Sequence, residues 1–253
     1  EILFYAEYPY FSSVSPSLVA HFAESAQHIM TERDLTASSL VVEAASNDGY
    51  MLKNFVAAGI PVLGIDPSRA PAAAAIDQDV PTMCTFFGAD LAKQLVREGK
   101  QADVFLANNV LAHVADLGGF VDGIRTVLKD DGVAVIEVPY VVDLVDHCEF
   151  DTIYHQHLCY FSVTALDKLF RRHGLYLNDI KRVPIHGGTL RLFLEKEDNV
   201  QPSVQKLLAD EKERKVDRID YFLDFADRVA HLKESLLSIM NEKKEQGNSI
   251  AAY

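Results

Sequence analysis

The sequence predicts an α/β fold whose sheet of seven strands is mostly parallel and is closed by an antiparallel hairpin at one edge. Between residues 40 and 195, short apolar runs alternate with amphipathic helical stretches, a pattern typical of a parallel sheet covered on both faces. Only Pro184–Thr189 separates the last two apolar runs, which leaves no room for a helix and predicts the hairpin. Helical patterns precede and follow this region, so we expect helices to flank the sheet at both ends of the chain.

The strands are predicted from apolar runs that turn residues bound. In chain order they are Leu40–Ala44, Val62–Ile65, Pro81–Thr85, Val104–Ala107, Val133–Val138, Tyr176–Val183 and Leu190–Glu195. Ser15 or Ser17 can cap a helix that runs through His21–Thr31, and Ser162 can cap another. Ser203–Glu245 carries apolar residues at helical spacing with charges on the opposite face, which predicts one or two helices.

We expect four parts along the chain. These are a lead-in segment with a helix (1–34), the sheet domain (35–198), a helical linker (199–247) and the start of a further domain (248–253). The last part reads as the opening of a buried strand, and a strand is not stable alone at a terminus. Because the first residue is glutamate rather than methionine, we expect a fragment of a longer protein.

Composition excludes several classes of protein. A net charge of −13 argues against nucleic-acid binding, which needs a basic face. No apolar run approaches the roughly 20 residues of a membrane span, and no secretory signal is present. Cys84, Cys148 and Cys159 lack the spacing of a zinc site or a disulfide framework, so we expect neither, and a cytoplasmic setting. The oligomeric state is left open.

The segment Glu43–Gly49 follows the first strand and opens a helix, as a nucleoside-binding turn does. Its only glycine is Gly49, so the GxGxxG fingerprint for a diphosphate is missing. An acidic Glu43 instead suits a ligand with an ammonium group, such as the methionine part of S-adenosylmethionine. Asp66 ends the second strand, where an acid hydrogen-bonds ribose hydroxyls.

Further cofactor candidates stand at the carboxyl ends of the third and fourth strands. Ligands of open α/β sheets lie outside these ends. Phe86 and Phe87 come where an adenine ring commonly sits, although core packing would also explain Phe86. The full set of candidate cofactor-binding residues is Glu43, Ala45, Asn47, Gly49, Asp66, Pro67, Phe86, Phe87, Asn108 and Asn109.

The segment Tyr154–Ser162 gathers two phenols, two imidazoles and an amide within nine residues. Proton acceptors and hydrogen-bond donors crowd together where a proton is removed beside a carbonyl. His157 is the expected base, because an imidazole titrates near neutrality. Tyr154 and His113, which follows the fourth strand, are the expected donors to the oxyanion. The structural alternative, a histidine held among aromatic rings, is favoured for His155.

These motifs, together with His186-Gly187-Gly188-Thr189-Leu190-Arg191 and the lead-in Tyr8–Ser13, resemble the sugar C-methyltransferases of deoxysugar biosynthesis. The resemblance implies a Rossmann-like class I methyltransferase fold, S-adenosylmethionine as cofactor, and methyl transfer to carbon beside the ketone of a nucleotide-linked (dTDP-type) 4-keto deoxysugar. Family members carry a zinc domain before this region and a further Rossmann-like domain after it. The chain would therefore be a fragment without either, and zinc is not expected here.

One departure concerns Gln156, where the family usually has glutamate between the two histidines. Glutamine cannot take a proton at neutral pH, but it can orient His157 or a sugar substituent, so we keep it in the catalytic set. The substrate candidates are residues that could close over the pocket or hold substrate oxygens or a phosphate, namely Tyr8, Tyr10, Tyr140, His186, Gly187 and Arg191.

Two other functions stay open from the sequence. A binding domain without catalysis would explain Gln156. An NAD-dependent oxidoreductase would share the acid at Asp66, but it would need the glycine turn that this chain lacks.

Overall fold

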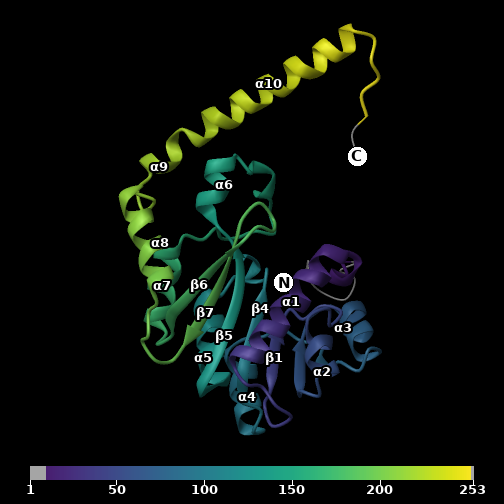
Figure 1. The fold of residues 1–253 in the computed structure, drawn as a ribbon, viewed down its shortest axis with the longest axis vertical. Helices are drawn as coiled ribbons and strands as arrows, with labels where there is room; N and C mark the ends of the chain where they lie inside the picture. Colours follow the sequence, from purple (N-terminus) through teal and green to yellow (C-terminus); the bar gives the residue numbers. More distant parts are fainter. Residues whose placement is uncertain (1–9, 252–253) are drawn as a thin grey trace.

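The computed structural model describes residues 10–251, built around one seven-stranded sheet (Figure 1). The strand order is β3-β2-β1-β4-β5-β7-β6. The strands are β1 (Val41–Ala44), β2 (Val62–Ile65), β3 (Thr82–Met83), β4 (Ala102–Asn108), β5 (Leu128–Pro139), β6 (Tyr176–Val183) and β7 (Thr189–Glu195). The first five are parallel, and β7 pairs antiparallel with both β5 and β6. The predicted fold class and edge hairpin are confirmed.

The helices alternate with the parallel strands. They are α1 (Pro16–Glu32), α2 (Leu52–Ala57), α3 (Arg69–Ile76), α4 (Ala89–Arg97), α5 (Leu117–Val127), α6 (Val141–His147), α7 (Val163–Arg172), α8 (Pro202–Glu213), α9 (Asp220–Leu223) and α10 (Phe225–Glu245), with short 3₁₀ turns η2 (Ser12–Val14), η3 (Leu111–His113) and η4 (Phe150–Thr152). The Oγ of Ser15 accepts from Leu18 N at 3.5 Å, and the Oγ of Ser162 accepts from Ala165 N at 3.1 Å. Both predicted caps are therefore formed.

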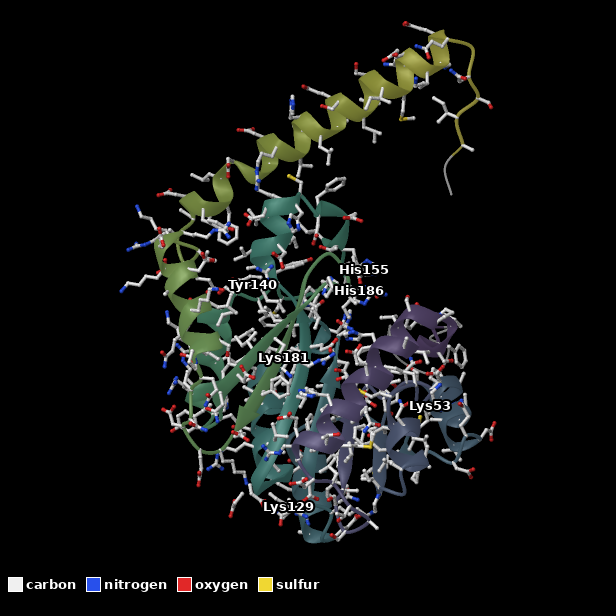
Figure 2. The ribbon with its side chains drawn as sticks, viewed as in Figure 1. Lys53, Lys129, Tyr140, His155, Lys181 and His186 are labelled. Atoms are coloured by element: carbon white, nitrogen blue, oxygen red, sulfur yellow. The ribbon has the colours of Figure 1, made fainter. Side chains whose placement is uncertain are left out.

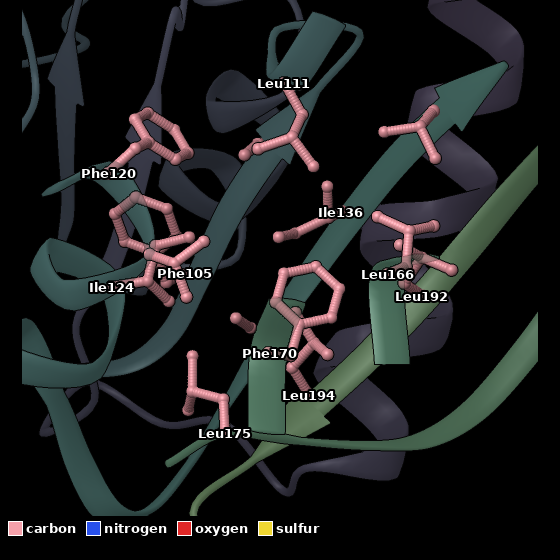
Figure 3. Close-up of a cluster of buried hydrophobic side chains, with 14 of the residues drawn as sticks. Phe105, Leu111, Phe120, Ile124, Ile136, Leu166, Phe170, Leu175, Leu192 and Leu194 are labelled. Carbon is pink, nitrogen blue, oxygen red and sulfur yellow. The ribbon is translucent and has the colours of Figure 1, made fainter. Parts of the chain in front are cut away.

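Two apolar layers bury the sheet, one on each face. Side chains of α1, α2 and α3 pack with one set of strand residues, and those of α4, α5 and α7 pack with the alternate set. Consecutive residues of β1 illustrate the alternation, because Val41 faces the first layer and Val42 the second. Phe105, Phe120 and Phe170 fill the second layer (Figure 3).

The segment predicted as a linker begins inside this body. The helix α8 contacts β6 and α7, and Val204 and Val216 are buried in the same core as the sheet. The helix α10 instead stands clear of the sheet (Figure 1), with Leu232, Leu236 and other apolar residues exposed.

The predicted C-terminal strand is not formed over residues 249–251, the part of it that the structure describes, and Ile250 is exposed. Ala252, Tyr253 and the predicted substrate contact Tyr8 lie outside the described residues.

Replacing Phe170 with alanine should lower the free energy of unfolding by about 3–5 kcal/mol, because this fully buried ring packs α7 on the sheet. The measurement is urea unfolding followed by circular dichroism. Ile219→Ala, at a side chain that is 72% exposed, is the control and should change stability by less than about 0.5 kcal/mol. Equal effects of the two substitutions would contradict the described core.

Candidate active site

The loop between β1 and α2 is held in shape by the carboxylate at the end of β2. Ala45 and Asn47 have left-handed backbone angles, with φ of 55° and 50°. Asp66 Oδ2 accepts from Asn47 N at 2.9 Å, and Asp66 Oδ1 accepts from Ser68 N at 2.8 Å. Burial raises the pKa of Asp66, although these two backbone bonds oppose the rise. The ends of two neighbouring strands are thereby joined where the cofactor was predicted.

Glu43 is fully buried at the end of β1, and among residues 10–251 no Lys, Arg or His forms an ion pair with it. Its Oε1 accepts from Asn108 Nδ2 at 3.0 Å and lies 3.5 Å from the Tyr50 hydroxyl. Burial raises the pKa of Glu43 from 4.5 to about 8, against the lowering effect of these hydrogen bonds. A cationic ligand would restore the ionised form, because opposite charge lowers a carboxyl pKa.

Several buried polar atoms near the carboxyl ends of β1 and β4 have no hydrogen-bond partner among the described residues. They are Glu43 Oε2, Ser46 Oγ, Asp48 Oδ1 and Asn109 Oδ1. Buried polar groups are normally hydrogen-bonded, so these atoms call for a ligand that carries donors. The ammonium and ribose hydroxyls of S-adenosylmethionine provide such donors. The residues present therefore fit this cofactor.

The lead-in segment lies across the same loop. Ser12 N donates to Asn47 Oδ1 at 2.8 Å, and Asn47 Nδ2 donates to the Tyr10 carbonyl at 3.0 Å. Ser13 N donates to Asp48 Oδ2 at 3.2 Å. The backbone of Tyr10 makes this contact, while its side chain is exposed. The sequence prediction placed Tyr10 over the pocket, and the structure brings it beside the cofactor loop.

The two phenylalanines after β3 differ in their surroundings. The Phe87 ring packs 4.7 Å from Phe105 and 5.3 Å from Phe120, centroid to centroid, and so belongs to the core. Phe86 is exposed and remains the better placed ring for an adenine. Pro67 is half-buried directly after Asp66, and Gly49 takes a φ of 76° at the end of the loop.

The predicted catalytic segment is attached to the end of β4. Leu158 N donates to the Ala112 carbonyl at 2.8 Å, and His113 Nδ1 donates to the Gln156 carbonyl at 2.8 Å. The Ala112 carbonyl and the His113 ring both belong to η3, which follows β4 within a few residues. Asn108 ends β4 and its side chain bonds Glu43 at the end of β1. This segment and the β1–α2 loop therefore both lie at the carboxyl ends of the parallel strands.

Tyr154 and His157 form a hydrogen-bonded pair in this segment, at the carboxyl ends of the strands. His157 Nδ1 lies 2.9 Å from the Thr152 carbonyl, which can only accept, so Nδ1 carries the hydrogen. In the neutral ring Nε2 is then an acceptor, and it lies 2.9 Å from the Tyr154 hydroxyl. The Tyr154 side chain is 43% exposed, so the pair is open to a substrate. A hydrogen-bond acceptor and a hydroxyl are thus adjacent at the two residues that the sequence analysis expects to be the base and an oxyanion donor.

The hydrogen bond of His113 bears on its predicted role as a donor to the oxyanion. Burial lowers its pKa, so the ring is neutral near pH 7. Its Nδ1 hydrogen is engaged with Gln156, which leaves no hydrogen on Nε2 to donate. This argues against His113 as an oxyanion donor. Its contact supports the Gln156 peptide instead, and its ring centroid lies 4.9 Å from that of His157.

Two predicted substrate contacts are engaged inside the protein. The Tyr140 hydroxyl donates to Glu211 Oε1 at 2.9 Å, and the residue is 1% exposed. Arg191 Nε donates to Glu137 Oε1 at 2.7 Å, and its Nη2 lies 3.1 Å from His21 Nε2. The Arg191 charge is therefore balanced by a carboxylate. Both arrangements argue against direct substrate contact.

The turn of the β6–β7 hairpin is packed against acidic side chains. Gly188 has a φ of 145°, and a Cβ there would lie 2.1 Å from Asp143 Oδ2. A Cβ at Gly187 would lie 2.1 Å from Glu149 Oε1. His186 lies beside them at the exposed turn, with its ring partly covered by the protein. This partial burial lowers the His186 pKa; the charge of Glu137 opposes the change, and those of His21 and His157 add to it. Figure 2 shows His155 and His186 at this end of the sheet.

Sequence reasoning missed several polar residues of this region. Glu137 could have been found, since a carboxylate within the apolar run Val133–Val138 signals a buried pair. Asp48 lies inside the predicted segment Glu43–Gly49, and Tyr50 directly follows it. Glu211 carries no such signal, because it is one charge among many on an amphipathic helix.

Within residues 10–251, no three side chains of the metal-binding types come together as a metal site requires. No helix in that part of the chain is long and apolar enough to cross a membrane.

Comparison with solved structures agrees with the fold. Magnesium protoporphyrin IX methyltransferase from Synechocystis PCC 6803, with bound S-adenosylhomocysteine, superimposes with a TM-score of 0.54 at 15% identity, over 71% of this chain and 83% of that one. 1,6-Didemethyltoxoflavin-N1-methyltransferase from Burkholderia thailandensis, also with S-adenosylhomocysteine, gives a TM-score of 0.53 at 19% identity, over 71% and 79% of the two chains.

Comparison with sequences is more specific. Residues 22–179 match the family described as methyltransferase domain, and residues 184–253 match the C-methyltransferase C-terminal domain. The C-methyltransferase NovU of Streptomyces niveus is 30% identical over 256 residues, which cover all of this chain and 61% of that protein. The chain thus spans about three fifths of the length of this curated relative. It belongs to the S-adenosylmethionine-dependent methyltransferase domain family, and its last part matches the C-methyltransferases.

Proposed function

We propose that the chain is the cofactor-binding and catalytic part of a C-methyltransferase that acts on a nucleotide-linked, dTDP-type 4-keto deoxysugar. The observation that carries the proposal is that the Tyr154–His157 pair and the β1–α2 loop after Glu43 lie at the same, carboxyl end of the parallel strands. The name of the relative from Streptomyces niveus supports methylation of carbon. The keto sugar is inferred from the motifs at residues 154–162 and 186–191.

Methylation at carbon requires removal of a proton from the carbon next to the ketone. His157 Nε2 takes that proton, and the Thr152 carbonyl keeps Nδ1–H oriented as the ring becomes cationic. The Tyr154 hydroxyl donates to the ketone oxygen, where the negative charge develops. A substrate placed between phenol and imidazole would thus find the acid and the base that deprotonation needs. Bound S-adenosylmethionine supplies an electrophilic methyl group on a positively charged sulfur.

The cofactor is proposed to lie over the β1–α2 loop. Glu43 and Asp48 offer carboxylate oxygens to the ammonium, and Asp66 and Asn47 stand where the ribose hydroxyls are expected. Phe86 is the candidate ring for the adenine. Tyr10, from the lead-in segment, would then lie next to both the cofactor and the sugar substrate.

Gln156 does not argue against catalysis on this geometry. Its contact with His113 is made by the backbone carbonyl, which accepts from Nδ1 of that ring. A carboxylate at this position is not needed for that bond, so glutamine can keep the segment in place. We also propose a cytoplasmic setting, which free Cys84, Cys148 and Cys159 favour.

In the full-length protein, His157→Ala should lower kcat for methylation of a dTDP-4-keto deoxysugar by about 10²–10⁴-fold, because the base is lost. The affinity for S-adenosylhomocysteine should stay within about twofold. His155→Ala, at an exposed neighbour, is the control and should keep kcat within a few-fold. Mass spectrometry of the product gives the rate and shows whether the methyl group is on carbon. Near-normal turnover by the His157 variant would exclude it as the base.

Glu43→Gln should stabilise the cofactor-free protein increasingly as the pH rises from 5 to 8. The folded-state pKa of about 8 lies above the ordinary 4.5, so the stability that the wild type gains from this group is lost as pH rises between these values. Glutamine does not ionise, so the free energy of unfolding of the variant should exceed that of the wild type near pH 8 by several kcal/mol, at most about 5. Thermal unfolding at a series of pH values measures it.

The same variant, Glu43→Gln, tests whether the ammonium group of the ligand binds beside Glu43. Binding of an ammonium group should restore the Glu43 carboxylate and release its proton, so wild-type affinity for S-adenosylhomocysteine should increase with pH up to about 8. Calorimetric titration should find weaker, less pH-dependent binding for Glu43→Gln. A stability difference that is constant with pH would show that Glu43 is ionised throughout.

A further inference from the structure

Glu211 is a buried carboxylate in α8 that contacts the helix after the candidate catalytic segment. It is 1% exposed. Its Oε1 accepts from Val163 N at 2.6 Å, and its Oε2 accepts from Thr164 N at 2.8 Å. These are backbone groups of the first turn of α7, where N–H groups have no partner within the helix. A carboxylate at a helix N-terminus is also favoured by the helix dipole.

The same carboxylate accepts from the Tyr140 hydroxyl at 2.9 Å. Tyr140 directly follows β5, and its backbone joins two loops. Its N–H donates to the Gly188 carbonyl at 3.1 Å, and it pairs with Phe161 in a short parallel bridge, where Val141 N donates to the Phe161 carbonyl at 3.0 Å. Glu211 therefore reaches the end of a central strand as well as the start of α7.

The loops joined at Tyr140 carry the candidate chemistry. Phe161 follows the Tyr154–His157 pair by four residues, and Gly188 follows His186 by two. Loss of the Glu211 contacts would free the first turn of α7 and the ring of Tyr140 together. Because the carboxylate is buried and all three of its donors are protein groups, its removal would leave two backbone N–H groups and one hydroxyl without their acceptor.

We propose that Glu211 is a positioning residue of the candidate active site: it fixes the start of α7 and Tyr140, and through them the Tyr154–His157 pair and His186. The inference rests on the proposed function for its effect on turnover. It also assigns a role to the segment after the sheet. The helix α8 lies in the part of the chain that matches the C-methyltransferase C-terminal domain, so Glu211 ties that part to the catalytic segment.

The experiment compares Glu211→Ala, Glu211→Gln and Tyr140→Phe in the full-length protein, with Glu213→Gln at an exposed position of α8 as the control. Hydrogen exchange, measured with S-adenosylhomocysteine bound, should be faster over residues 152–165 in Glu211→Ala and unchanged over β1 and β2. Its kcat should fall about tenfold or more, while KM for S-adenosylmethionine stays within about twofold. Glu211→Gln should recover part of both, because its carbonyl oxygen still accepts one N–H.

Wild-type exchange and wild-type kcat in a folded Glu211→Ala protein would overturn the proposal. Should that variant not fold, Tyr140→Phe decides, because it removes only the hydroxyl: faster exchange over residues 161–164 supports the proposal and unchanged exchange overturns it. The exchange measurement does not depend on methyl transfer. Failure of the wild type to methylate any keto sugar nucleotide would therefore reject the proposed function, while the exchange data would still decide the role of Glu211.

Discussion

The short parallel contact between Tyr140 and Phe161 determines where the candidate catalytic segment lies. The residues between them form a helix, a 3₁₀ turn and an irregular stretch outside the sheet. The contact begins where β5 ends, so the position of the segment is set by a buried central strand. The second attachment, from Leu158 to Ala112, starts from the neighbouring β4. Reactive side chains on an irregular segment thereby obtain the rigidity of the sheet.

Two buried carboxylates on the same face of the sheet have opposite electrostatic surroundings. Glu137 lies against Arg191 and His21, so its charge is compensated within the protein. Glu43 has hydrogen-bond donors but no cation, and burial raises its pKa. On the proposed function, this difference would favour a positively charged ligand at the end of β1 rather than β5, because such a ligand would restore the ionised form of Glu43. Folding thus leaves one buried carboxyl without a cation, among the described residues, at the place where the cofactor is proposed to bind.

The fold was predictable because its signal is local: the central strands β1, β2, β4 and β5 contain apolar runs, and the six-residue gap before Leu190 admits only a hairpin. The cluster at residues 154–162 was visible for the same reason. The partners of Tyr140 and Arg191 were not, because Glu211 and Glu137 are distant in sequence and only packing brings them together. The His113 tautomer was equally hidden, since it depends on the Gln156 carbonyl. The start of α8 inside the core depends on Val204, whose spacing looks the same in a solvent-exposed helix.

The collision that any side chain would make at Gly187 and Gly188 limits how relatives of this protein can diverge. Glu149 and Asp143 occupy the space above the turn, so neither position can acquire a new chemical group without moving an acid. If the turn borders the substrate, as proposed, differences in the molecule accepted would arise at flanking positions, of which His186 is the exposed one. New specificity would then come from the residues around the turn rather than from its two glycines.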